Sequence, residues 1–251
     1  GLTSNFALNE SFINTAQLRS SVVSLAEGLG YGTKSYTSSQ AELSLSVQIS
    51  ASDRPTVLTL PRNTQFTTSV AGISYTFQTR ENFTAIDSGT GFYQFINDTD
   101  GNDIPVFEGT EKTKTFFVGD TSDTQIFVIP DITMDTNTIR VRVFNTASSP
   151  LFDTYTNIKK AIRITDDSTF YQIKEVPNGY YEIVFGNGIA TGKRPVAGNK
   201  IVIDYLSTVG TVANGATIFT PSSTFTVNSV EYNIAVTTST CLLYTSDAAD
   251  D

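Results

Sequence analysis

From residue 41 onwards the chain consists of short segments in which apolar and polar residues alternate, and this alternation restricts the fold more than any other feature. The clearest segment runs from Ala41 to Ile49, where every second residue is apolar. A period of two places all the apolar side chains on one face of an extended strand. We therefore expect a half-buried β-strand over 41–49.

Further strand candidates follow at short intervals, and turn-forming dipeptides separate several of them. The candidates lie at 57–60, 73–79, 83–86, 92–96, 113–118, 125–129, 138–144, 161–164, 170–175, 180–185, 200–206 and 230–236. A polar stretch that ends near Ile158 has the composition of a short helix. Strands at this spacing, with few helical patterns between them, predict a mainly β fold with antiparallel, sandwich-like sheets.

Only the N-terminal part has a clear helical period. Leu18, Val22 and Leu25 recur at helical spacing, and Asn14 stands where a helix N-cap is expected. A helix over 15–27 has two interpretations. It covers an open sheet end of its own domain, or it docks on a partner subunit as an assembly helix.

These patterns predict two β subdomains after a helical segment. The segment occupies 1–40, the first subdomain 41–135, and the second 136–240. Residues 241–251 resemble the translation of a transposon-end adapter used in sequencing libraries, so we expect them to be foreign to the natural protein. They include Cys241, the only cysteine, which leaves no disulfide or thiolate chemistry.

Composition excludes several function classes. The chain has 251 residues, with 16 basic and 25 acidic residues and a net charge of −9, so we expect no nucleic-acid partner. It has no histidine, which excludes Ser-His-Asp and Cys-His catalysis and histidine-bound zinc. No apolar run is long enough for a membrane helix. We expect no metal, no cofactor, no membrane insertion and no small-molecule substrate.

The densest glycine spacing lies between Phe185 and Gly215, and it suggests a phosphate-binding loop. The spacing fails for both known loop types, because Thr191 stands where a dinucleotide fingerprint needs glycine and Arg194 follows Lys193 where a P-loop needs Ser or Thr. We instead expect Gly186 and Gly188 to form a tight corner between the strands at 181–185 and 201–206. The substitution Gly188→Val is therefore expected to impair folding or assembly.

Acidic pairs and aromatic residues leave two other functions open. Neighbouring carboxylates occur at 120/123, 131/135 and 166/167, and a glycoside hydrolase needs two carboxylates across a cleft. Exposed tyrosines among the 11 present could stack on sugars in a carbohydrate-binding, adhesin-type module. The segments from Leu60 to Thr67 and from Thr220 to Thr226 also resemble each other, and chance explains this as well as duplication does.

Three patches of the sequence resemble the baseplate wedge subunits of contractile-tailed bacteriophages, the baseplate J-like family. Two patches are 12–31, followed by the strand from Ala41, and 60–66 with 75–77. The third and most specific patch begins at 170–171 and 179–183. It continues through the proposed structural motif Phe185, Gly186, Asn187, Gly188, Gly192, Pro195, Gly198, Tyr205, Gly210, Asn214 and Gly215.

The resemblance implies a structural role and no catalytic residues. Such subunits pair as homodimers, bind other wedge proteins and join into the ring around the tail hub. It also implies a virion protein located in the tail baseplate and assembled in the host cytoplasm. Family members are longer than this chain.

Overall fold

The computed structural model describes residues 35–97, 101, 103–119, 125–160, 167–186 and 192–242, with residues 160 and 238–242 described by their backbone alone. The predicted helix with Leu18, Val22 and Leu25 lies outside the described residues, as does the predicted strand at 161–164. Among the described residues, no helix combines the length and the apolar character that crossing a bilayer requires.

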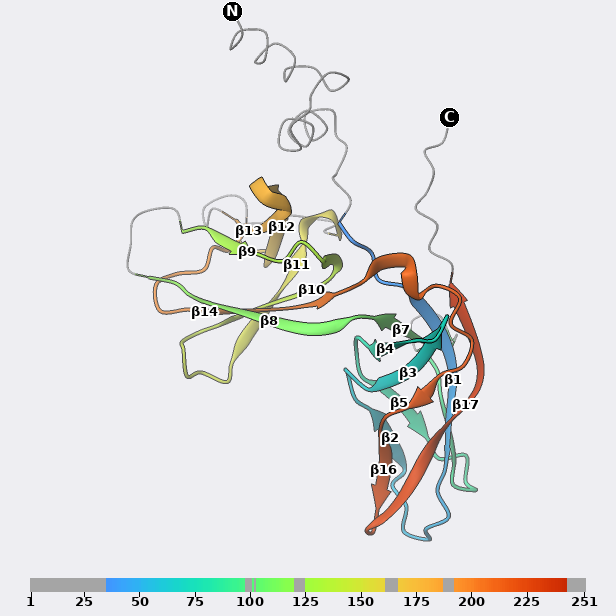
Figure 1. The fold of residues 1–251 in the computed structure, drawn as a ribbon. Helices are drawn as coiled ribbons and strands as arrows, with labels where there is room; N and C mark the ends of the chain where they lie inside the picture. Colours follow the sequence, from blue (N-terminus) through green and yellow to red (C-terminus); the bar gives the residue numbers. More distant parts are fainter. Residues whose placement is uncertain are drawn as a thin grey trace, which may run out of the picture. The chain divides into compact units, whose positions relative to one another are not determined.

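The chain forms two compact units, each assembled from separated segments (Figure 1). Unit 1 contains Gly1–Tyr36 and Lys112–Tyr205, and unit 2 contains Thr37–Glu111 and Leu206–Asp251. Residues on both sides of position 135 therefore lie in unit 1. The predicted subdomain boundary at 135 concerns which parts of the chain fold independently, and it stays a prediction.

Unit 2 is built on an eight-stranded sheet with the order β15-β3-β4-β7-β1-β17-β16, in which β6 also pairs with β1. The strands are β1 (Gln40–Gln48), β3 (Gln65–Val70), β4 (Ile73–Thr79), β6 (Phe92–Phe95), β7 (Ile104–Glu108), β15 (Thr220–Pro221), β16 (Thr224–Val227) and β17 (Val230–Leu242). Every pair in this sheet is antiparallel. The two ends of the order, β15 and β16, are separated in sequence only by Ser222 and Ser223, so the sheet curls into a near-barrel.

A second, two-stranded sheet of unit 2 pairs β2 (Val57–Leu60) with β5 (Phe83–Ile86). Its inward residues join the same hydrophobic core as those of the larger sheet. Leu58 and Leu60 from β2 pack in one cluster with Leu43, Leu45 and Val47 from β1. The alternation predicted from Ala41 onwards is confirmed, because these alternate residues of β1 are buried.

Unit 1 is built on a seven-stranded sheet with the order β8-β14-β10-β11-β12-β13-β9. The strands are β8 (Thr110–Phe117), β9 (Phe127–Ile129), β10 (Met134–Phe144), β11 (Phe152–Asn157), β12 (Phe170–Val176), β13 (Tyr180–Phe185) and β14 (Lys200–Ser207). The β11–β12 pair is parallel, an exception to the antiparallel pattern. Short 3₁₀ turns occur at η1 (Ile158–Lys160), η2 (Pro177–Gly179) and η3 (Gly210–Ala213), the last of which belongs to unit 2.

The sheet of unit 1 also curls, and aromatic side chains fill its interior. The rings of Phe116 and Phe127 lie 5.4 Å apart at their centroids, although their strands, β8 and β9, stand at opposite ends of the sheet order. Phe127 in turn contacts Phe185 at 5.5 Å, and Phe185 contacts Tyr155 at 5.3 Å. Edge-to-face contacts of this kind stabilise a core beyond the area they bury.

The prediction of a mainly β chain with antiparallel sheets is confirmed. Strands with a simple apolar alternation were predicted at their observed positions. β3, β7, β11, β15 and β16 were missed. Threonine and other polar residues take several positions of β3, β11 and β16, β7 contains Pro105, and β15 has only two residues. The prediction of a short helix near Ile158 is wrong for 152–157, which form β11, and only the single turn η1 follows.

Candidate functional site

The glycine-rich stretch links β13 to β14, and these strands are not neighbours in the sheet of unit 1. β13 pairs with β12 and β9, whereas β14 lies between β8 and β10. The prediction of a tight corner between the two strands is therefore wrong, because the chain crosses from one part of the sheet to another. Gly186 is buried, while Asn187 and Gly188 lie outside the described residues.

Gly192 occupies a position that only glycine fits. Its φ is +78°, and a Cβ added there would lie 2.4 Å from Cε1 of Phe170 and 2.7 Å from the carbonyl oxygen of Ser168. Both the backbone conformation and the close approach of β12 therefore require glycine. The next residue, Lys193, donates its backbone N–H to the Ser168 carbonyl at 2.9 Å.

In the loop that follows Lys193, the polar groups form hydrogen bonds within the protein. The N–H of Gly198 (φ +87°) donates to the carbonyl of Val118 at 2.9 Å. The side-chain amide of Asn199 donates to the carbonyl of Asn145 at 3.0 Å, and its oxygen accepts from the N–H of Val196 at 2.8 Å. A phosphate loop needs free N–H groups that converge on an anion. Here these groups hold neighbouring loops together.

Three further members of the predicted motif, Phe185, Pro195 and Tyr205, lie in the interior of unit 1. Phe185 is half-buried in the aromatic core, and Pro195 is buried. Tyr205 is also buried, and its hydroxyl donates to the carboxylate of Asp131 at 3.2 Å. Burial, with the nearby charge of Asp131, raises the pKa of Tyr205 to about 12, so the phenol stays protonated at neutral pH.

The remaining motif residues, Gly210, Asn214 and Gly215, lie in unit 2 around η3. The N–H of Gly210 (φ +76°) donates to Oγ1 of Thr208 at 2.9 Å. Asn214 is extended, with φ −62° and ψ 146°, and Gly215 has φ +90°. This sequence of angles is typical of a type II turn rather than of the type I′ turn common in two-residue hairpins.

A buried carboxylate, Glu108, holds the start of η3. Its Oε2 accepts hydrogen bonds from Oγ1 of Thr208 at 2.5 Å and from the N–H of Val209 at 3.2 Å. Desolvation by burial raises the pKa of Glu108, although both hydrogen bonds act in the opposite direction. Sequence reasoning missed this residue, because nothing local to Glu108 indicates a contact one hundred positions away.

The predicted carboxylate pairs serve as local turn contacts where they are described. Oδ1 of Asp131 accepts from the N–H of Thr133 at 3.0 Å, and Oδ1 of Asp135 accepts from the N–H of Asn137 at 2.9 Å. Burial opposes ionisation of Asp131, but Lys112 at 2.8 Å and Thr133 lower its pKa. A general acid needs a raised pKa, so Asp131 is unsuited to that role.

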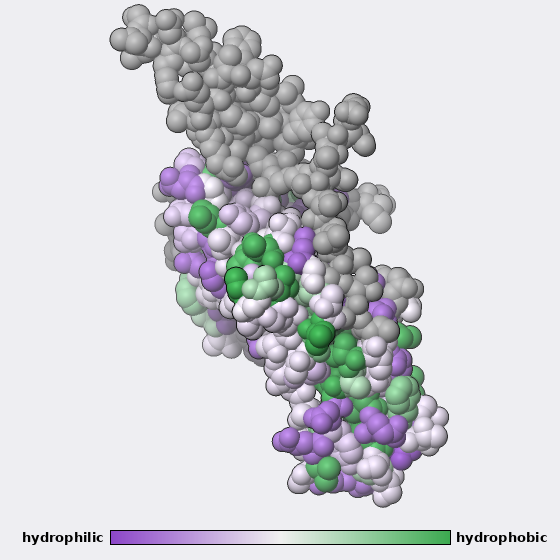
Figure 2. Space-filling view, turned by 45° about the vertical axis from the view of Figure 1, so that its right-hand side comes forward, coloured by the Kyte–Doolittle hydropathy of each residue, from purple (hydrophilic) through white to green (hydrophobic). Residues whose placement is uncertain are grey.

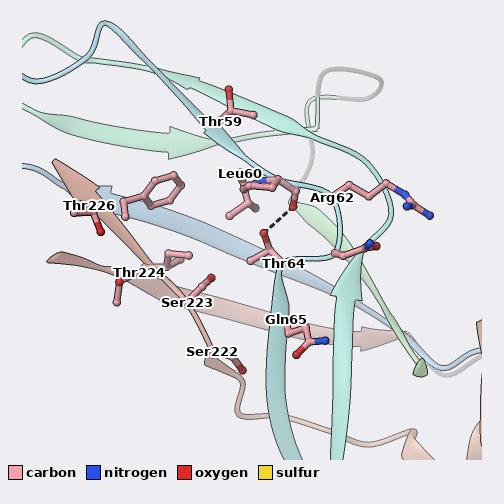
Figure 3. A pocket seen from close by; sticks show the side chains of 13 residues that line it. Thr59, Leu60, Arg62, Thr64, Gln65, Ser222, Ser223, Thr224 and Thr226 are labelled. Carbon is pink, nitrogen blue, oxygen red and sulfur yellow. Dashed lines mark hydrogen bonds between the residues drawn. The ribbon is translucent and has the colours of Figure 1, made fainter. Parts of the chain in front are cut away.

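A groove of about 500 Å³ lies in unit 2 between β2 with its following turn and β16 (Figure 3). Its lining is mostly small and polar, with an apolar floor, and contains no carboxylate and no tyrosine. The lining residues are Thr59, Leu60, Pro61, Arg62, Asn63, Thr64, Gln65, Ser222, Ser223, Thr224, Phe225, Thr226 and Ile234. This composition favours neither a carboxylate-based hydrolase nor sugar stacking on tyrosine.

The two segments with similar sequences form the opposite sides of this groove. Each leads into a hairpin with a two-residue turn of positive φ, at Ala71-Gly72 (50° and 81°) and at Asn228-Ser229 (52° and 65°). Their likeness was the only sequence signal for the site. It indicated no role, because a groove between distant segments has no local pattern.

Exposed apolar side chains are distributed over both units, and Figure 2 shows hydrophobic patches among hydrophilic residues on one face of the molecule. In unit 1 they include Phe117, Ile126, Leu151 and Val196. Exposed apolar patches are typical of surfaces that contact other proteins.

Comparison with known proteins gives one informative similarity. The chain is 30% identical over 240 residues to the baseplate wedge protein gp6 of Enterobacteria phage T4. The match covers 88% of this chain and 34% of gp6, so the chain spans about a third of the length of that relative. No family model matches the sequence. By its sequence, the chain is similar to a baseplate wedge protein over most of its own length.

Proposed function

We propose that the chain is a structural component of a phage tail baseplate wedge and is located in the virion. The similarity to baseplate wedge protein gp6 over 88% of the chain carries this proposal. The glycine-rich stretch supports it, because its glycines and its N–H groups shape and join loops of the fold. Its described residues form no anion site.

The proposed activity is assembly through protein–protein contacts. The chain pairs with a second copy and binds other wedge proteins, and the wedges join into a ring around the tail hub. The predicted helix with Leu18, Val22 and Leu25 is one proposed contact, and the exposed apolar residues of unit 1 are another. Neither contact involves a catalytic residue.

Co-purification tests this proposal directly. The full-length subunit is expressed alone and together with the products of the neighbouring baseplate genes, and masses are measured by size-exclusion chromatography with light scattering. We expect a dimer alone and a larger, defined complex with the other wedge proteins. A subunit that stays monomeric and forms no complex with them would contradict the assembly function.

A further inference from the structure

The wall of unit 2 is interrupted between β2 and β16. Among the described residues, β2 pairs only with β5 and β16 pairs only with β17. Each of the two strands therefore has a second edge whose backbone N–H and C=O groups are not covered by another strand. Open edges of this kind are templates for an additional strand.

The two open edges belong to the same wall, because both strands face the same core. Leu60 of β2 is buried in the core of unit 2, and Phe225 and Val227 of β16 pack against that core. The alternate residues Thr59 and Thr226 point outwards and are exposed. The groove lies between the strands, and Figure 3 shows its lining residues coming from both sides.

The hairpin register shows which backbone groups of β16 point into the groove. Val227 and Val230 flank the two-residue turn Asn228-Ser229 and are paired. Such flanking residues exchange both of their hydrogen bonds with each other, and the next pair along the ladder exchanges none. The N–H and C=O groups of Thr226, and of Thr224 two residues earlier, are therefore directed to the open edge.

Charge indicates which kind of strand would enter. The only charged lining residue is Arg62, which is paired with Glu111 at 2.5 Å, so the groove itself is neutral. Without residues 241–251, unit 2 has 3 basic and 10 acidic residues, a net charge of −7. Glu231 pairs with Thr226 across the β16–β17 ladder and is exposed, one strand away from the open edge. At this groove, the same acidic unit of a second copy would be repelled.

We propose that the groove between β2 and β16 binds an extended strand from another protein, which adds to the open edge of β16. The strand has neutral alternating residues, with apolar side chains towards Leu60, Phe225 and Ile234, and basic residues at its ends. Main-chain hydrogen bonds provide affinity in this type of recognition, and alternate side chains provide specificity. The inference rests on the proposed assembly function, for which it supplies a contact site.

The first experiment measures peptide binding to the intact chain. The probe is a peptide of alternating valine and threonine with two lysines at each end, and the control probe carries glutamates at its ends. We expect the lysine-ended peptide to bind more tightly and to slow hydrogen exchange at the amides of Thr224 and Thr226. Failure to bind, or binding without protection of these two amides, would overturn the proposal.

A pair of substitutions at one position separates backbone recognition from hydroxyl recognition. Thr226→Pro removes the N–H at the open edge without removing a hydrogen bond to β17, and we expect it to weaken peptide binding about tenfold. Thr226→Val removes only the hydroxyl, and we expect a change below about twofold. An equal loss in both variants would indicate recognition of the hydroxyl, as by a glycan, and would overturn the proposal.

The same variants separate this inference from the assembly function. A wedge complex that forms equally well with Thr226→Pro and with the unchanged chain would rule out the groove and leave assembly intact. Absence of any complex with the unchanged chain would contradict assembly itself. If Thr226→Pro fails to fold, amide protection in the unchanged chain decides the question.

Discussion

Unit 1 and unit 2 each contain a sheet that curls towards a barrel. They differ in how the strands that border the remaining gap are held. In unit 1 the side-chain amide of Gln125 donates to the carbonyl of Phe117 at 2.9 Å, and the rings of Phe116 and Phe127 meet beside it. The end strands β8 and β9 are thereby held together. In unit 2 a groove lies between β16, an end strand of the larger sheet, and β2 of the two-stranded sheet.

The two units also differ in net charge. Lys112–Tyr205 of unit 1 carries 11 basic and 10 acidic residues, whereas unit 2 without residues 241–251 carries 3 and 10. All three basic residues of unit 2 form internal ion pairs: Arg54 with Asp87, and Arg62 and Arg80 with Glu111. A closed unit with balanced charges and an open, acidic unit therefore share one β architecture and are suited to different contacts.

The largest expected effect is that of Gly192→Val in unit 1. The new side chain would meet the Phe170 ring and the Ser168 carbonyl, at a φ that valine disfavours. We expect a loss of about 3–5 kcal/mol in the free energy of unfolding. Hydrogen exchange read by peptide should show faster exchange in β12 and β14 and little change in β1 and β3.

Gly198→Ala is the matched control, because it has a similar φ of +87° but nothing within 4 Å of an added Cβ. It should cost only about 1 kcal/mol. Equal effects of the two substitutions would show that the close contact at Gly192 contributes nothing. If Gly192→Val increased hydrogen exchange equally in both units, its effect would not be specific to unit 1.

Asp204→Asn should have the next largest effect, again on unit 1. The Asp204 side chain is 5% exposed, and its two oxygens contact Nη2 of Arg142 at 2.7 Å and Oγ1 of Thr113 at 2.8 Å. Neutralising it leaves a partly buried guanidinium without its counter-charge, so we expect a loss of about 2–3 kcal/mol, measured by urea unfolding. The double variant Asp204→Asn with Arg142→Met removes the unpaired guanidinium. If it is no more stable than Asp204→Asn alone, the unpaired charge is not the cause of the lost stability.

Glu108→Gln tests unit 2 through pH. Burial raises the pKa of Glu108 in the folded state, so the folded protein holds a proton that the unfolded chain releases near pH 4.5. The contribution of Glu108 is therefore fully present below pH 4.5 and declines as pH rises through the raised pKa. Glutamine keeps an acceptor for Thr208 and does not titrate.

Unfolding curves between pH 4 and pH 8 measure this difference. Relative to Glu108→Gln, the unchanged chain should lose stability as pH increases, and the effect should appear in unit 2 alone. A difference between the two proteins that is constant with pH would refute the assigned cause.

The smallest expected effect concerns salt. Without residues 241–251 unit 2 has a net charge of −7, and its self-repulsion is screened as ionic strength increases, because the Debye length falls to about 3 Å at 1 M salt. We expect unit 2 to gain about 1 kcal/mol or less between low and high salt, and unit 1 to gain nothing comparable. Hydrogen exchange at both salt concentrations measures this, and an equal response of both units would contradict the charge comparison.

The sequence alone determined the fold class and the positions of strands such as β1, β2 and β13. In these strands, burial of one face imposes a period of two that neighbouring residues display. It also determined that the glycine-rich stretch is not a phosphate loop, because the spacing of the glycines is local information. The resemblance to baseplate wedge proteins was likewise present in local patches of residues.

Only the tertiary structure decided which strands are neighbours. β13 and β14 were expected to meet at a corner, yet three strands separate them in the sheet order. Position 192 requires glycine because the Phe170 ring lies close to it. The hydrogen-bond partner of Glu108 is Thr208, one hundred positions away. The groove likewise requires the turn after β2 to meet β16, 160 positions away, and no periodicity within either segment records that distance.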